Sequence, residues 1–403
     1  MPELPEVETV ARDLRGLVVG ARITGVRVTW LKTLRSQDVE AFEAAVVGRE
    51  IVGTSRRAKL VVLDLDDGSA ITIHLKMTGQ LFVVRAGVME DPYIRLVLSF
   101  ADGRELWFRD IRKFGRVGIA RRGGASGDLE GELGGGKGFK GFGPEPLDPA
   151  FTARVFRARI RGRKGRLKPL LLDQGFLAGV GNIYADEALW AARLHPLRSA
   201  TSLRPGDAGR LFREIRRILA EAVERRGSSI DDYTAPEGDG SMQERLLVYQ
   251  RAGEPCMRCG RPVRRIVIGA RSTHFCSWCQ RLPAGDKPGA ATILRGMEPR
   301  PGRRERAGDG AGSGNGGAAG SAGSAGSEPA IRRGPRWTEI GGGELGTPTG
   351  STRRAGGVSR AERTKRAAAT RRAAARASTG ALPVSTEARP EPAGAPSDST
   401  EAG

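Results

Sequence analysis

The 403-residue sequence contains no apolar stretch long enough to cross a membrane. No run approaches the roughly 18 consecutive apolar residues of a membrane-spanning helix. The N-terminus also lacks the charged-then-apolar order of an export signal. We therefore expect a cytoplasmic protein with no membrane partner.

Cysteine is scarce and confined to one short segment. The four cysteines form two Cys-x-x-Cys pairs separated by sixteen residues, whereas a secreted protein would spread its cysteines to staple loops. Each pair fits a tight turn, and two such turns on a β-hairpin complete a tetrahedral site with no open position. We predict one structural Zn²⁺, although the spacing is also compatible with disulfides or iron. Its ligands would be Cys256, Cys259, Cys276 and Cys279.

Acidic residues are outnumbered, 46 to 66, which gives a net charge of +20. Such an excess favours a polyanionic partner such as nucleic acid or an anionic surface, but a basic soluble enzyme also fits. Residues 281–403 hold 20 basic and 12 acidic residues, so the rest of the chain keeps +12 of the charge. The partner prediction therefore does not depend on this segment alone.

Residues 281–403 contain one aromatic residue, Trp337, and are dominated by Gly, Ala, Ser, Pro and Arg. Such a composition buries too little apolar surface to offset the entropy of ordering, so we predict a disordered basic tail. Its Ala- and Arg-rich residues 359–377 could become helical on DNA. A solvated tether is the alternative that we favour.

The remaining sequence predicts the α+β class. Short strands with turn residues between them occupy residues 23–120, for example 60–65, 70–75 and 94–100. Helical patterns cover residues 3–16 and 151–226.

The first residues offer an unusual chemistry. Removal of Met1 would expose Pro2 as a secondary amine, and an α-amino group with a pKa of about 7.7–8 is partly unprotonated at neutral pH. Such an amine can attack a sugar C1′ and form an iminium, with Glu3 or Glu6 as the proton donor. An ordinary helix start, with Pro5 in its first turn, explains the same residues and on this stretch alone would be preferred.

The opening Pro2–Thr9 and the four-cysteine module together closely resemble formamidopyrimidine-DNA glycosylases. Further segments resemble motifs of that family in the same order along residues 2–280: 56–59, 74–79, 110–115, 143–147, 168–174 and 179–187. The resemblance implies an N-terminal β-sandwich with an N-terminal helix (1–122), a helical domain with a helix–two-turns–helix motif (151–245) and a β-hairpin zinc finger (246–280). Composition adds a Gly-rich hinge or insertion (123–150) and the tail (281–403), and in both of these the chain departs from the family.

The resemblance also implies a mechanism. Pro2 would displace the damaged base and form a Schiff base with the opened sugar, and Glu3 would donate the proton. Lys59 resembles the family's proton donor for β-elimination, and Arg271 its finger residue for δ-elimination. Because an arginine is a poor acid, we interpret Arg271 mainly as a phosphate clamp.

A flipped base leaves a void that must be filled, and the resemblance assigns this role to Met77, Arg112 and Phe114. Arg163, Lys168 and Asn182 match the family's DNA contacts. The structural alternative for Met77 and Phe114 is ordinary core packing. For Lys59 and Arg163 it is a solvated surface charge. The expected partner is damaged double-stranded DNA, bound by a monomer associated with the nucleoid; His195 is expected to be structural.

The chain departs from the family at several points. Tyr93 stands where a histidine is usual, although its hydroxyl could replace that DNA contact, and residues 240–242 end the lesion-recognition loop atypically. An endonuclease VIII-like enzyme for oxidised pyrimidines is the nearest alternative. Leu4 and the two-loop origin of the void-filling residues instead favour oxidised purines. A catalytically silent DNA-binding protein is the other alternative, and the presence of Pro2, Glu3 and Lys59 speaks against it.

Overall fold

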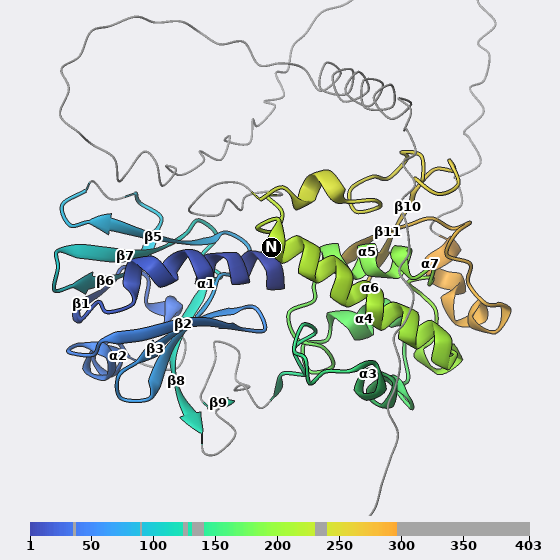
Figure 1. Ribbon diagram of the computed structural model, residues 1–403. Helices are drawn as coiled ribbons and strands as arrows, with labels where there is room; N and C mark the ends of the chain where they lie inside the picture. The colour runs from blue at the N-terminus through green and yellow to red at the C-terminus, as the bar shows by residue number, and fades with distance from the viewer. Residues whose placement is uncertain (35–37, 89–90, 124–127, 131–140, 230–239, 296–403) are drawn as a thin grey trace, which may run out of the picture. The chain divides into compact units, whose positions relative to one another are not determined.

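The structure, a computed structural model, describes residues 1–34, 38–88, 91–123, 128–130, 141–229 and 240–295 (Figure 1). Its element order confirms the predicted α+β class: strands dominate the first part, and helices followed by a β-hairpin make up the second. Of the predicted Gly-rich hinge, residues 124–127 and 131–140 lie outside the described residues. The same is true of residues 230–239 and of the tail from 296 onward, including residues 359–377.

Two antiparallel sheets share one apolar core in the first part of the chain. One has the order β1-β6-β7-β5 and the other β2-β3-β4-β8-β9. Residues of both sheets and of helix α1 (Leu4–Val18) fill the core, so the β-sandwich prediction is confirmed. The strands are β1 (Ile23–Val28), β2 (Ile51–Arg57), β3 (Leu60–Leu65), β4 (Ser69–His74), β5 (Gly79–Arg85), β6 (Ile94–Phe100), β7 (Arg104–Asp110), β8 (Arg116–Gly123) and β9 (Asp128–Glu130); a short helix α2 (Val39–Val46) lies between β1 and β2.

The register of β2 and β3 places a functional candidate at the end of a tight turn. Arg57 pairs with Leu60, which leaves only Ala58 and Lys59 between the two strands. Ala58 has a φ of 53°, the left-handed conformation that such a short connection requires. The β-hairpin therefore fixes where the Lys59 backbone lies.

Four helices make up the predicted helical region: α3 (Ala153–Ile160), α4 (Leu167–Leu172), α5 (Asn182–Ala191) and α6 (Pro205–Glu224). Helix α6 buries Leu211, Ile215, Ile218, Leu219 and Ala222, the i, i+4, i+7, i+8 pattern of an amphipathic helix. These side chains pack on residues of α3 to α5 in a second core.

The β-hairpin β10 (Arg264–Ile268) and β11 (Arg271–Phe275) follows, as predicted for the cysteine module. The expectation of a disordered tail from residue 281 is wrong for residues 281–295. They form two short 3₁₀ turns and helix α7 (Ala291–Arg295), and Ala290 joins a cluster with Ile266 and Ile268. A few apolar residues are enough to order this segment, because they pack on apolar side chains of the β10–β11 hairpin.

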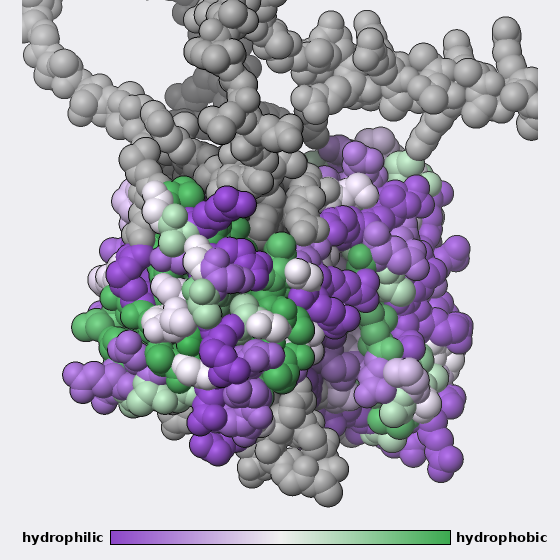
Figure 2. All heavy atoms as spheres, turned by 60° about the vertical axis from the view of Figure 1, so that its left-hand side comes forward, coloured by the Kyte–Doolittle hydropathy of each residue, from purple (hydrophilic) through white to green (hydrophobic). Residues whose placement is uncertain are grey.

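Figure 2 brings the sheet-bearing part forward and shows polar and apolar side chains interspersed on that face. Among the described helices, none has the length and apolar character needed to cross a membrane.

Candidate active site and zinc centre

The start of helix α1 is held against the start of helix α5. Backbone N–H groups of Gly181, Ile183 and Tyr184 donate to the carboxylate of Glu3, with distances of 2.8, 2.8 and 3.4 Å. Glu3 is 2% exposed. A carboxylate at a helix N-terminus satisfies donors that have no partner within the helix. This contact, made across nearly 180 residues of sequence, fixes the position of the N-terminal residues.

Glu6 reinforces the same junction. Its Oε2 accepts from the Glu3 backbone N–H at 2.9 Å, and its Oε1 accepts from Ser228 N at 2.8 Å and from the Tyr184 hydroxyl at 2.6 Å. These bonds use Glu6 to hold the chain. Both carboxylates named from the sequence thus hold the start of α1, and Glu3 is the one that directly follows Pro2.

Glycines allow this close approach. A Cβ on Gly181 would lie 2.5 Å from Glu3 Oε1, and one on Gly227 would lie 2.8 Å from Glu6 Oε1. Gly227 also has a φ of 74°, which side chains rarely adopt. Gly181 and Gly227 thus leave room for the two carboxylates.

The β2–β3 turn that carries Lys59 is held by Glu145. The Glu145 carboxylate accepts from Ala58 N at 2.6 Å and forms ion pairs with Arg56 at 2.7 Å and Arg57 at 2.8 Å. Arg56 also pairs with Glu8 of α1 at 3.0 Å. These bonds connect the sandwich to the segment that enters the helical region, and sequence reasoning missed the role of Glu145.

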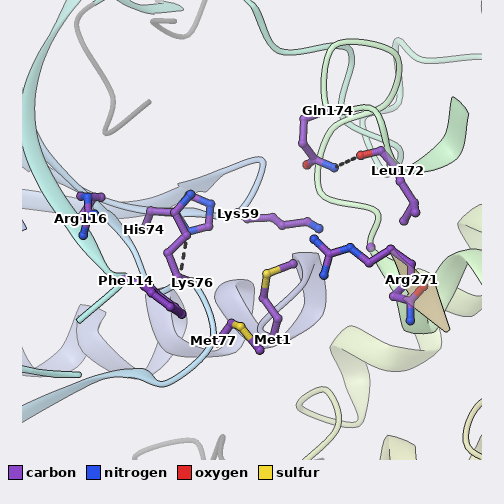
Figure 3. Close-up of a pocket in the computed structure, with 12 residues that line it drawn as sticks. Met1, Lys59, His74, Lys76, Met77, Phe114, Arg116, Leu172, Gln174 and Arg271 are labelled. Atoms are coloured by element: carbon purple, nitrogen blue, oxygen red, sulfur yellow. Dashed lines mark hydrogen bonds between the residues drawn. The ribbon is translucent and has the colours of Figure 1, made fainter. Parts of the chain in front are cut away.

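A pocket of about 530 Å³ brings the candidate residues together (Figure 3). Its walls come from the sheets and from the helical and hairpin segments. The side chains of Lys59 and Arg271 point toward one another across it, and Met1 lies next to Met77 (Figure 3). The lining residues are Met1, Lys59, His74, Lys76, Met77, Phe114, Arg116, Leu172, Gln174, Gly181, Asn182 and Arg271.

Burial shifts the pKa values of Glu3 and Lys59 in opposite directions. Burial raises the pKa of Glu3, helped by the charge of Glu6 and opposed by Lys59. Burial lowers the pKa of Lys59, helped by Arg271 and opposed by Glu3. A carboxyl with a raised pKa and an amine with a lowered pKa in the same region are typical of sites that transfer protons.

His74 also lines the pocket, and sequence reasoning gave it no role. Burial and the charge of Lys76 lower its pKa to about 3, so its imidazole is neutral. Its Nδ1 accepts from Lys76 N at 3.0 Å. The other ring nitrogen then carries the hydrogen and can donate to a ligand.

Met77 and Phe114 both line the pocket, and Phe114 is 46% exposed, which excludes the core-packing alternative for it. Arg112 lies over the Phe114 ring at 5.2 Å. Lys59 is 7% exposed and therefore not a solvated surface charge. The guanidinium carbons of Arg95 and Arg109 lie 5.8 Å and 5.2 Å from the centroid of the Tyr93 ring, and Tyr93 is not among the residues that line the pocket.

Asn182 lines the pocket, and its amide oxygen is buried with no hydrogen-bond partner among the described residues. Arg163 is exposed and lies over the Phe176 ring at 5.8 Å. Both side chains are available to a ligand. His195 accepts from Leu197 N and packs on the Phe275 ring, in agreement with a structural role.

Lys168 differs from expectation. Its side chain has no exposed surface, pairs with Asp186 at 2.6 Å and donates to the Ser272 carbonyl at 2.9 Å. Asp186 in turn accepts from the backbone N–H of His274. A direct DNA contact by Lys168 does not fit this burial. The lysine instead ties helices α4 and α5 to the strand that begins with Arg271.

The four predicted zinc ligands converge on one point. Their Sγ atoms all lie within 4.8 Å of one another, and two of the separations are 3.5 Å and 4.0 Å. A tetrahedral ion with Zn–S bonds of about 2.3 Å requires separations of about 3.8 Å, whereas a disulfide requires about 2.05 Å. All four cysteines are free. The cluster is therefore compatible with one structural zinc and not with the disulfide alternative.

Three family models match the chain in succession. Residues 1–117 match the formamidopyrimidine-DNA glycosylase N-terminal domain, residues 142–234 the H2TH domain of the same proteins, and residues 253–282 a zinc finger found in FPG and IleRS. The matched segments contain the pocket and the cysteine cluster.

Similar proteins extend over the same part of the chain. A formamidopyrimidine-DNA glycosylase from Herpetosiphon aurantiacus is 44% identical over 282 residues, which is 70% of this chain and 100% of that protein. The crystal structure of the MutM (Fpg) protein from Thermus thermophilus has 43% identity and a TM-score of 0.61, with the same coverage. A Lactococcus lactis FPG mutant, in complex with a Fapy-dG-containing DNA, has 33% identity and a TM-score of 0.62 at that coverage.

Proposed function

Because the chain belongs to the formamidopyrimidine-DNA glycosylase family, we propose that it is a bifunctional DNA glycosylase and AP lyase of base excision repair. Its substrates would be oxidised purines, 8-oxoguanine and formamidopyrimidines, in double-stranded DNA. The observation that carries the proposal is that Met1, Lys59 and Arg271 line one pocket, while the buried carboxylate of Glu3 interacts electrostatically with Lys59.

The first step uses the N-terminal amine. Met1 must be removed, because the nitrogen of Pro2 is otherwise an amide with no free electron pair. The amine attacks C1′, the glycosidic bond breaks, and the base leaves with its electron pair and takes up the proton that the amine nitrogen loses. Ring opening then gives an iminium, and Glu3, whose pKa is raised, supplies the proton that O4′ takes up.

The second step cleaves the strand. The iminium withdraws electrons from C2′, so a base can remove a C2′ proton while the 3′ phosphate leaves with the C3′–O electron pair. Lys59 has a lowered pKa and can exchange a proton at this stage. Arg271 faces Lys59 and would hold the phosphate. The 5′ phosphate would leave in a second elimination, again after removal of a sugar proton and with the electron pair of its C–O bond.

Base flipping and DNA binding complete the proposal. Met77 and Phe114 lie at the pocket where they can fill the vacated stack, with Arg112 beside Phe114 to pair with the orphaned base. Asn182, at the first turn of α5, and neutral His74 can donate to backbone phosphates. The zinc would hold the hairpin that carries Arg271 and takes no part in the chemistry.

Borohydride trapping tests the proposal. The chain, with Met1 removal verified by mass spectrometry, is incubated with duplexes that contain 8-oxoguanine opposite cytosine or an oxidised pyrimidine. We expect a covalent adduct on the 8-oxoguanine duplex that is lost or strongly reduced in Pro2→Gly. An adduct only on the pyrimidine duplex would replace the purine assignment. Tight binding without any adduct would replace the enzyme with a silent DNA-binding protein.

A further inference from the structure

The zinc module has a second pocket, distinct from the one in Figure 3. It measures about 430 Å³ and is lined by Arg193, Arg258, Trp278, Arg281 and two of the cysteines. Arg258 lies in the first cysteine turn, Arg281 follows the second, and Arg193 follows helix α5 with a φ of 57°. The lining of this pocket shares no residue with that of the candidate active site.

Trp278 organises two of the cations. The guanidinium carbons of Arg261 and Arg281 lie 3.8 Å and 4.4 Å from its ring centroid, and the indole is 48% exposed. Stacking orients the guanidinium groups and leaves their N–H edges open to a ligand. Such edges match the oxygens of a phosphate.

Arg258 is committed to the fold. It stacks on Trp190 at 3.7 Å and donates to the carbonyls of Trp190 and Ala191 at the C-terminal end of α5. Within the described part of the chain, no ion pair joins Arg193, Arg261 or Arg281 to a carboxylate.

The zinc centre accounts for only part of this charge. Four thiolates around Zn²⁺ carry a net charge of about −2. Four arginines therefore exceed it by about two positive charges. Arg193, Arg261 and Arg281 are exposed and present positive charge that an anion from outside the chain can complement.

We propose that Arg193, Arg261 and Arg281, beside Trp278 and the fold-held Arg258, form a second phosphate-binding surface, which binds the backbone of a DNA segment other than the one held at the lesion pocket. The inference goes beyond the proposed excision reaction. DNA backbone is favoured over an acidic peptide because arginine forks match phosphate and because the family acts on DNA, which brings phosphodiesters to this face. The protein would thus contact two DNA segments at once.

A second-duplex titration tests this proposal. The protein is first saturated with an unlabelled duplex that carries a reduced abasic site, and a labelled undamaged duplex is then added at several salt concentrations. The variant R193A/R281A removes two cations but spares Arg258, which caps α5. The matched control R85A/R154A removes two exposed arginines from β5 and α3.

We expect wild type and control to bind the second duplex alike. R193A/R281A should bind it at least tenfold more weakly, and its slope of log affinity against log salt should fall by roughly 0.9 per lost phosphate contact. R193K/R281K should be intermediate, because lysine keeps the charge without the fork. Excision at the lesion pocket should be unchanged in all variants; failure of the wild type to excise would contradict only the proposed function.

Three outcomes would overturn the inference. One is equal binding of the second duplex by R193A/R281A and the control. Another is loss of zinc or a lower Tm in R193A/R281A, which would show that the two arginines stabilise the zinc centre by balancing the charge of its thiolates. The last is tighter binding of an oligo-glutamate peptide than of the duplex, which would assign the surface to an acidic protein partner.

Discussion

Replacing Gly181 with alanine tests how Glu3 is held. The added Cβ would lie 2.5 Å from Glu3 Oε1, so the carboxylate must leave the start of α5 or the helix must shift. The backbone of Gly181 has a φ of −131°, which alanine adopts without strain. The effect of Gly181→Ala therefore reports the contact with Glu3 and not a backbone penalty.

The magnitude follows from the hydrogen bonds that are lost. A bond to a charged group contributes about 1.5–3 kcal/mol. Loss of one or two of the N–H donors to Glu3 should raise the barrier to base release by about 2–4 kcal/mol, which corresponds to a roughly 30- to 1,000-fold slower reaction. We expect this decrease in single-turnover excision of 8-oxoguanine.

The pH dependence should change as well. Backbone N–H donors stabilise the ionised carboxylate, so their loss raises the pKa of Glu3 beyond the increase that burial already causes. Glu3 acts in its protonated form, so the rate falls as pH rises through this pKa. The falling limb of the pH–rate profile should therefore move to higher pH in Gly181→Ala.

Gly206→Ala is the matched control, because Gly206 also lies in the first turn of a helix and its Cβ would meet nothing within 4 Å. It should leave the rate unchanged. Thermal unfolding and zinc content verify the fold of both variants. If Gly181→Ala excises the base at the wild-type rate with an unshifted profile, the role given to Glu3 is refuted.

Three further predictions concern the supports of the site. Glu145→Gln should lower the free energy of unfolding by about 2 kcal/mol, because Arg56 loses its charged partner. It should also lower kcat while KM changes little, because the turn that carries Lys59 is held less firmly. An unchanged kcat would contradict this. Removal of zinc with a chelator under mild denaturant should abolish DNA binding and lower the Tm, and apo protein that binds normally would refute it. A chain that ends at Gln280 should have a lower Tm than one that ends at Arg295, and the latter should match the full chain; equal Tm values would show that residues 281–295 add nothing.

Local patterns in the sequence determined much of the fold. Short apolar runs ended by turn residues predicted β3 and β6 closely, and the helical pattern over residues 151–226 predicted the region that contains α6. The cysteine spacing predicted the zinc cluster, because two tight turns on a hairpin fix the four thiolates locally. The order of motifs predicted the family.

Only the tertiary structure decided how the site is held. Glu3 meets the start of α5, and Glu145 meets the Lys59 turn, across long stretches of sequence. Lys168 is buried against Asp186, although a lysine in a basic sequence suggests a surface charge. Contacts of this kind depend on which surfaces folding brings together, and neither periodicity nor composition records that.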